Sequence, residues 1–234
     1  CWADERHGNV DLTSAILQSC DIYFYKTVQY YELDRLAQYF RLFGFGKITG
    51  IDIGREYKGT IPNTDFMNKR YGRFGWSKGS LLNFCIGQGE ILVTPIQVFN
   101  YVNLLATKGN SNSPHLVSST KKDSEIEIPL SSQIWDRIIF DMGQVISHAK
   151  GTGKNADPAI QGAKIYGKTG TAENPHGEDH AWFIGWVEYD KKKFSIVVLL
   201  ENSGSGGAVA APLAKNVFDK IILGIDNSKQ ISMK

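Results

Sequence analysis

A lysine, two threonines and a glycine stand in a row within the stretch IYGKTGTAENPHGEDHAWFIGW, residues 165–186. Lys168 would supply positive potential, and the hydroxyls of Thr169 and Thr171 could donate hydrogen bonds to a carboxylate. Gly170 would let a substrate backbone come close, and a backbone N–H of the same strand could stabilise an oxyanion. A solvated turn at the end of a strand explains four such common residues equally well. The alternative interpretation is functional: these residues would bind an anionic group of a ligand.

A second candidate pair, Ser19 and Asp21, lies between two helical stretches in the triplet Ser-Cys-Asp. Two polar side chains at a junction between helices can both project into one cleft. Read alone, Ser19 is as well explained as a helix N-cap and Asp21 as an acid in a first helical turn. The combination is more specific, because the pair lies in a helical part and the lysine in a later strand-rich part.

Apolar periodicity predicts most of the helices in the first 160 residues. Asp11 is a candidate cap for LTSAILQ, and Thr94 begins a helix that Gly109 ends. The stretch 47–83 is rich in glycine and is predicted to be irregular and outside the core. Helical stretches are also expected in 21–31 and 32–46. In SSQIWDRIIFDMGQVIS the inward residues are expected to be Ile134, Ile138, Ile139, Met142 and Val145.

The last third of the chain changes character. Residues 163–173, 180–189 and 193–202 are predicted to be strands, and 207–224 a closing helix. Helices followed by an antiparallel meander and a helix on top of it indicate an α+β fold, with three α/β/α layers and a helical subdomain. We therefore expect a mainly helical part, 1–160, and a part with strands and helix, 161–234.

The composition excludes some classes of protein. The 234 residues are 42% hydrophobic, enough for a substantial core, and the formal net charge of +2 gives no electrostatic case for nucleic acid. No apolar run approaches the roughly 20 residues that cross a bilayer, and no signal peptide is visible. The odd number of cysteines, three, does not suggest a disulfide framework. Without an initiator methionine, the chain is expected to be the interior of a longer protein.

Four segments together resemble the transpeptidase domain of class B penicillin-binding proteins. They are HGNVDLTSAILQSCD (7–21), GQGEILVTPIQ (87–97), KTGTA (168–172) and AWFIGW (181–186). The second is the most specific, because class A β-lactamases lack it; both groups share S-D-N and K-T-G motifs. Asp21 and FGFGKITGIDIG (43–54) are similar to the elongation type of this family. The resemblance implies a fold like that of serine β-lactamases and a D,D-transpeptidase that cross-links peptidoglycan.

The resemblance also implies roles for the matching residues. Ser19 would take part in proton transfer, and Asp21 would hydrogen-bond the amide backbone of the substrate and help to fix the network of the general base. Lys168 would set the electrostatics of the site. Thr169 and Thr171 would hold the terminal carboxylate of a D-Ala-D-Ala stem peptide or of a β-lactam antibiotic. The N–H of Thr171 would form half of the oxyanion hole.

The chain departs from the family pattern at the nucleophile. Relatives carry it in an S-x-x-K motif before the serine–acid pair, and nothing before Ser19 fits. The strings Ser118–Lys121, Ser119–Lys122 and Ser147–Lys150 all come after that pair. We therefore expect the nucleophilic serine upstream of this chain, which alone would be inactive. A non-catalytic scaffold or β-lactam sensor is the alternative; a β-lactamase is disfavoured by residues 87–97.

Cys1, His7 and Cys20 are spaced C-x5-H-x12-C, and thiolates with an imidazole suit a structural zinc ion. The fourth ligand would lie upstream or be Asp4. Buried thiols and a loop histidine explain these residues equally well, and no cofactor is required.

The resemblance further implies a membrane-anchored enzyme on the outer face of the inner membrane. It would act in the periplasm, with the anchor upstream of this chain, and its partner would be a membrane glycan polymerase of the elongation machinery.

Overall fold

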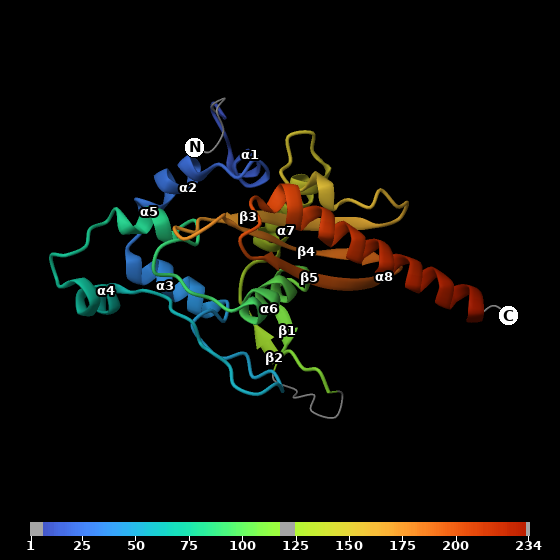
Figure 1. The fold of residues 1–234 in the computed structure, drawn as a ribbon, viewed down its shortest axis with the longest axis horizontal. Coiled ribbons are helices and arrows are strands. Elements are labelled where there is room, and N and C mark those ends of the chain that lie inside the picture. The colour runs from blue at the N-terminus through green and yellow to red at the C-terminus, as the bar shows by residue number, and fades with distance from the viewer. Residues whose placement is uncertain (1–6, 118–124, 233–234) are drawn as a thin grey trace. The chain divides into compact units, whose positions relative to one another are not determined.

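The structure, a computed structural model, describes residues 7–117 and 125–232 (Figure 1). It forms two compact units: one comprises the chain up to Ala15 together with Cys20–Trp135, and the other comprises Ile16–Ser19 and the chain from Asp136 onward. Helices and antiparallel sheets occur together, which confirms the α+β fold class. No helix within the described residues is long and apolar enough to cross a membrane.

The first unit consists mainly of helices. Two of its predicted caps are confirmed: the N–H of Ser14 donates to Asp11 Oδ1 (2.8 Å), and Thr94 forms a capping box with Gln97. A short antiparallel ladder follows the last of its complete helices. The elements are α1 (Leu12–Leu17, whose last two residues belong to the other unit), α2 (Asp21–Val28), α3 (Leu33–Leu42), α4 (Thr64–Tyr71), α5 (Ser80–Phe84), α6 (Pro95–Ala106), β1 (Asn110–Asn112) and β2 (Glu125–Glu127).

The prediction that residues 47–83 are irregular and outside the core was partly wrong, although residues 47–63 and 72–79 form no helix or strand, as predicted. Helices α4 and α5 begin in this stretch, and Met67, Leu81 and Phe84 are buried in a cluster with α2 and α3. Asn63 caps α4 by accepting from the N–H of Phe66 (2.9 Å). Both helices are short and carry too few apolar residues to produce a periodic stripe, so the sequence pattern did not indicate them.

The second unit is built on a three-stranded antiparallel sheet, and the three strands expected from the sequence are confirmed. The order is β3 (Lys164–Ala172), β4 (His180–Tyr189), β5 (Lys192–Leu200), with Lys168 opposite Ile184. A π-helical turn, η3 (Gly206–Ala210), leads into α8 (Ala211–Ser232), which lies along the sheet in Figure 1. Phe218 and Ile222 of α8 share one core cluster with Phe183 and Val187 of β4.

Helix α7 (Ser132–Ser147) passes from the first unit into the second between Trp135 and Asp136. The expectation that Ile134 points inward was wrong: it is 45% exposed, and Trp135 is buried instead. A single-face pattern fails where a helix moves from one core to another. The division of the chain at residue 160 was based on the positions of the two motifs, whereas the two units are defined by contacts. The division at residue 160 therefore stays a prediction.

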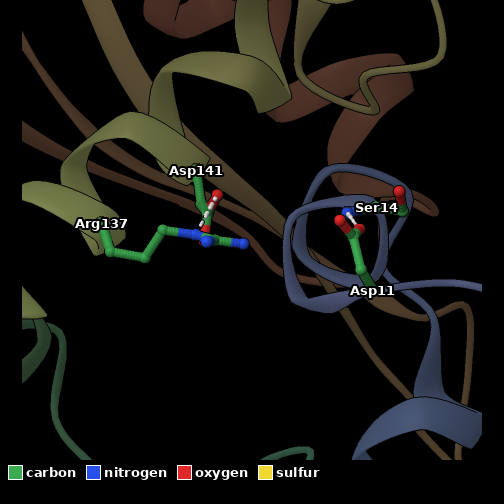
Figure 2. A network of polar contacts seen from close by, with 4 residues as sticks. All are labelled: Asp11, Ser14, Arg137 and Asp141. Atoms are coloured by element: carbon green, nitrogen blue, oxygen red, sulfur yellow. Dashed lines mark hydrogen bonds and ion pairs between the residues drawn. The ribbon is translucent and has the colours of Figure 1, made fainter.

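In the second half of α7, Met142 and Val145 are buried as expected. Asp141 is fully buried too, which the apolar pattern did not indicate, and Arg137 Nε lies 3.0 Å from its carboxylate (Figure 2).

Candidate functional site

Ser19 ends the turn that follows α1, and its backbone is in the left-handed region with φ of 52°. The N–H of Ser19 donates to the carbonyl of Ile16 (3.3 Å), which closes the turn. A non-glycine residue in this conformation costs about 1–3 kcal/mol, and such residues concentrate at functional sites. The turn directs the Ser19 hydroxyl to Lys168, whose Nζ donates a hydrogen bond to Ser19 Oγ. Two residues that are 149 positions apart in the sequence therefore meet.

Lys168 occupies the middle of β3, where its side chain is half-buried. Its Nζ also donates to the carbonyl oxygen of Thr169 (2.8 Å). Within the described residues β3 pairs with β4 alone, so β3 is an edge strand of this sheet. A cation held between a serine hydroxyl and a backbone carbonyl at a strand edge suits an anionic ligand that comes alongside the strand.

The two threonines of β3 contact two other segments of the second unit. Thr169 Oγ1 donates to Thr152 Oγ1 (2.7 Å), and Thr171 Oγ1 accepts from the N–H of Gly206 (3.2 Å). Sequence reasoning missed Thr152 and Gly206. The signals for them were the runs Gly-Thr-Gly at 151–153 and Ser-Gly-Gly at 205–207, in which small residues allow close backbone approach.

Asp21 is the first residue of α2 and belongs to the first unit, whereas Ser19, Lys168, Thr169 and Thr171 belong to the second. Its place in the first helical turn agrees with the simpler interpretation of this acid. Asp21 also acts on Cys85: burial, and then the negative charge of Asp21, raise the pKa of the Cys85 thiol to about 11.

Of the three candidate zinc ligands, Cys1 lies outside the described residues. Cys20 is buried and carries a free thiol, and it stands at the N-cap of α2 without capping it through its side chain. Among the described residues no group of three or more His, Cys, Asp or Glu side chains could hold a metal ion. His7 and Cys20 alone do not complete a four-ligand site, so zinc stays a prediction.

The S-x-x-K strings that begin at Ser118 and Ser119 fall outside the described residues. Ser147 is the last residue of α7, and its hydroxyl donates to the carbonyl of Gly143 (3.0 Å). That side chain is therefore turned back onto its own helix, in contrast to a serine whose hydroxyl is activated by a lysine.

The fold and this cluster define a class of protein. The family described as "Penicillin binding protein transpeptidase domain" matches residues 2–219. The chain belongs to this family.

Relatives narrow the class to the elongation type. Peptidoglycan D,D-transpeptidase MrdA of Haemophilus influenzae is 35% identical over 243 residues, covering 93% of this chain and 37% of the relative. MrdA of Escherichia coli K12 is 29% identical over 253 residues, covering 97% of this chain and 39% of the relative. The chain thus spans under two fifths of the length of these curated relatives.

Two solved structures are similar over nearly the whole chain. Penicillin-binding protein 2 of Helicobacter pylori, in its complex with MreC, has a TM-score of 0.80 and 32% identity and covers 93% of this chain and 42% of that one. Penicillin-binding protein 2 of Pseudomonas aeruginosa, in complex with WCK 5153, has a TM-score of 0.79 and 34% identity, covering 90% and 47%. The resemblance to penicillin-binding protein 2, the elongation type, is confirmed.

Proposed function

We propose that this chain is the C-terminal part of the transpeptidase domain of a peptidoglycan D,D-transpeptidase that cross-links stem peptides by serine acyl transfer. The observation that carries the proposal is the hydrogen bond from Lys168 Nζ to Ser19 Oγ. It joins the serine of one family motif to the lysine of the other, although the serine lies in a turn between two helices and the lysine lies on a strand.

The reaction would run in two steps. A serine outside this chain attacks the carbonyl between the two D-Ala residues, an ester forms, and the terminal D-Ala leaves with a proton. The amine of a neighbouring stem peptide then attacks the ester, an amide forms, and the serine recovers its proton. Because the nucleophile lies outside, the chain alone would not acylate.

Residues of this chain would supply the rest of the site. Ser19, held by Lys168, would pass protons between the nucleophile and the leaving amine, and the ammonium would stabilise the negative charge that develops. Thr169 and Thr171 would turn their hydroxyls to the terminal carboxylate, and the N–H of Thr171 would donate to the oxyanion. For Asp21, which belongs to the first unit, a hydrogen bond to the amide backbone of the substrate stays a prediction from the family resemblance alone.

The same site would take β-lactam antibiotics, whose carboxylate and reactive amide imitate the end of the stem peptide. The complete protein would act in the periplasm, anchored at the outer face of the inner membrane, beside a glycan polymerase of the elongation machinery. These assignments rest on similarity to MrdA and penicillin-binding protein 2.

Labelling of the complete protein with a fluorescent penicillin tests the proposal. Wild type is expected to be labelled, and Lys168→Ala and Ser19→Ala to lower the labelling rate constant by roughly a hundredfold or more, the usual loss when one group that stabilises a transition state is removed. Lys164→Ala is a matched control, because this exposed lysine begins the same strand. A Lys168→Ala protein that is labelled as fast as wild type would refute the proposed site.

A structural zinc ion bound by Cys1, His7, Cys20 and a fourth ligand is a separate proposal. It would hold the segment between Ser19 and Asp21. Metal analysis of the complete protein, with its thiols protected from oxidation, is expected to give about one equivalent of zinc, and less after Cys20→Ser. Wild-type protein that contains under about a tenth of an equivalent would exclude the site.

A further inference from the structure

Thr152 is held in a tightly packed turn directly after α7, between two glycines. A Cβ added to Gly151 would lie 2.2 Å from the carbonyl oxygen of Val145, and one added to Gly153 would lie 2.9 Å from Ile146 Cδ1. Both distances are shorter than van der Waals contact, so neither position accepts a larger residue without movement. The packing therefore fixes where the backbone and side chain of Thr152 lie.

The backbone of Thr152 binds the segment that carries Ser19. Its N–H donates to the carbonyl oxygen of Leu17 (3.1 Å), the last residue of α1. Leu17 is only 4% exposed and stands two residues before Ser19, whose φ is 52°. A hydrogen bond to a buried residue this close to a left-handed residue helps to hold the chain in that uncommon conformation.

The side chain of Thr152 binds the lysine strand. Its Oγ1 accepts the hydrogen bond from Thr169 Oγ1 (2.7 Å), one residue after Lys168. Its carbonyl oxygen faces η3, because a Cβ on Gly207 would lie 2.8 Å from it. Asn155, three residues further on, donates from Nδ2 to the carbonyl of Gly207 (2.9 Å).

We propose that Thr152 is a positioning residue that joins the two motif segments: its N–H holds the turn of Ser19, and its hydroxyl holds the side chain of Thr169. When a ligand carboxylate binds, the hydrogen bond between the two hydroxyls reverses, so that Thr152 donates to Thr169 Oγ1 and Thr169 donates its one proton to the carboxylate. What it positions these groups for rests on the proposed function. The backbone of Thr152 holds the Ser19 turn, and its side chain holds Thr169. A substitution that changes only the side chain therefore tests the contact with Thr169 and leaves the contact with Leu17 in place. Thr152 acts through Thr169 and does not itself touch the reacting atoms.

The variants Thr152→Val and Thr152→Ser test the side-chain task in the complete protein. Valine keeps the shape and the N–H but removes the hydroxyl that hydrogen-bonds to Thr169, whereas serine restores a hydroxyl. Acylation by a fluorescent penicillin with a free carboxylate is expected to slow about tenfold in Thr152→Val and to recover to within about threefold in Thr152→Ser. With the methyl ester of the same penicillin the valine variant should match wild type, because the carboxylate is masked.

A second readout needs no activity. Methyl NMR of threonine-labelled protein reports the χ1 rotamer of Thr169, expected to be single in wild type and Thr152→Ser and averaged in Thr152→Val. The matched control is Thr107→Val, which removes an exposed hydroxyl that donates to the carbonyl of Asn103 in the first unit.

An unchanged Thr169 rotamer in Thr152→Val would overturn the proposal. An equal loss of acylation rate with the free-acid penicillin and with its methyl ester would also overturn it, because such a loss would mean that Thr152 has only a structural role. If wild type is not labelled at all, the proposed function fails, and the rotamer alone then decides whether Thr152 orients Thr169.

Discussion

The left-handed backbone of Ser19 allows the effect of a substitution on stability to be measured separately from its effect on activity. Ser19→Gly and Ser19→Ala both remove the hydroxyl that accepts from Lys168, so the two variants differ chiefly in the backbone. Glycine adopts a φ of 52° without the steric cost that a Cβ imposes. The glycine variant is therefore expected to be about 1 kcal/mol more stable than the alanine variant, although both label slowly with penicillin.

Thermal denaturation of the two variants measures that difference. Equal melting temperatures for Ser19→Gly and Ser19→Ala would mean that the turn is not strained.

Cys85 offers a residue-scale test of the place of Asp21 within the first unit. Burial and the nearby Asp21 carboxylate raise the pKa of the Cys85 thiol from 9.0 to about 11. A raised pKa favours the neutral thiol in the folded protein, so this contribution to stability is present below pH 9.0 and is lost as the pH rises through about 11. At neutral pH little thiolate forms, and Cys85 is expected to react slowly with disulfide reagents.

Asp21→Asn removes the charge and should lower that pKa, which would speed the reaction of Cys85 between pH 8 and pH 10. Rates measured against pH on a background with Cys1→Ser and Cys20→Ser follow Cys85 without the other two cysteines of this chain. Identical profiles with and without the Asp21→Asn substitution would show that the carboxylate does not act on this thiol.

The sequence indicated those functional residues whose polar or charged side chains are unusual in the predicted element that carries them. A lysine and two threonines within a strand pattern pointed to β3, and the structure brings Lys168 to Ser19. Thr152 and Gly206 could not be found in that way. Thr152 acts through its backbone N–H and its hydroxyl, and Gly206 acts through the absence of a side chain. The glycine-containing runs at 151–153 and 205–207 mark close backbone approach but do not indicate any chemistry.

At the scale of elements, the contact between η3 and β3 depends on glycine. A Cβ on Gly206 would lie 2.2 Å from the carbonyl oxygen of Trp182 and 2.3 Å from that of Gly170, and backbone atoms cannot move aside cheaply. Gly206→Ala is expected to destabilise the second unit by about 1–3 kcal/mol and to displace the strand that carries Lys168.

Gly224 in α8 is the matched control, because nothing lies within 4 Å of a Cβ placed there. Gly224→Ala should be neutral or stabilise the helix by up to about 1 kcal/mol. Chemical denaturation measures both free energies of unfolding, and a Gly206→Ala protein as stable as Gly224→Ala would contradict the close packing of η3 on β3.

Elements with a long regular pattern could be predicted, and so could the short helices α1 and α2, but the short helices α4 and α5 could not. The alternation in β3, β4 and β5 and the caps of α1 and α6 are local features that a sequence displays directly. Helices α4 and α5, with eight and five residues, are too short to repeat a pattern and depend on burial of Met67 and Phe84. The exposed Ile134 shows the same limit in α7, whose inward face changes where the helix passes between cores.

At the scale of the whole molecule, the chain passes between the two units three times: after Ala15, after Ser19 and after Trp135. The order of motifs suggested one division near residue 160. It could not show that four residues, Ile16–Ser19, belong to a unit that is otherwise built from the chain after Trp135. Tertiary contacts decide this membership, and Leu17 lies in the same core cluster as Val145 and Phe183.

This interleaving predicts which part of the molecule loosens when a core side chain is shortened. Leu17→Ala should destabilise the second unit, although residue 17 lies near the start of the chain and most of that unit comes from the chain after Trp135. Met67→Ala, the matched control, should destabilise the first unit. Each substitution is expected to lower the free energy of unfolding by about 2–5 kcal/mol. Hydrogen exchange followed by mass spectrometry measures protection separately in β3–β5 and in α4–α6. Loss of protection in β3–β5 alone after Leu17→Ala would mean that the Ser19 turn is stabilised together with the lysine strand. An equal loss of protection in β3–β5 and in α4–α6 would mean instead that the two units unfold together. The turn containing Ser19 would then not be stabilised by the second unit in particular.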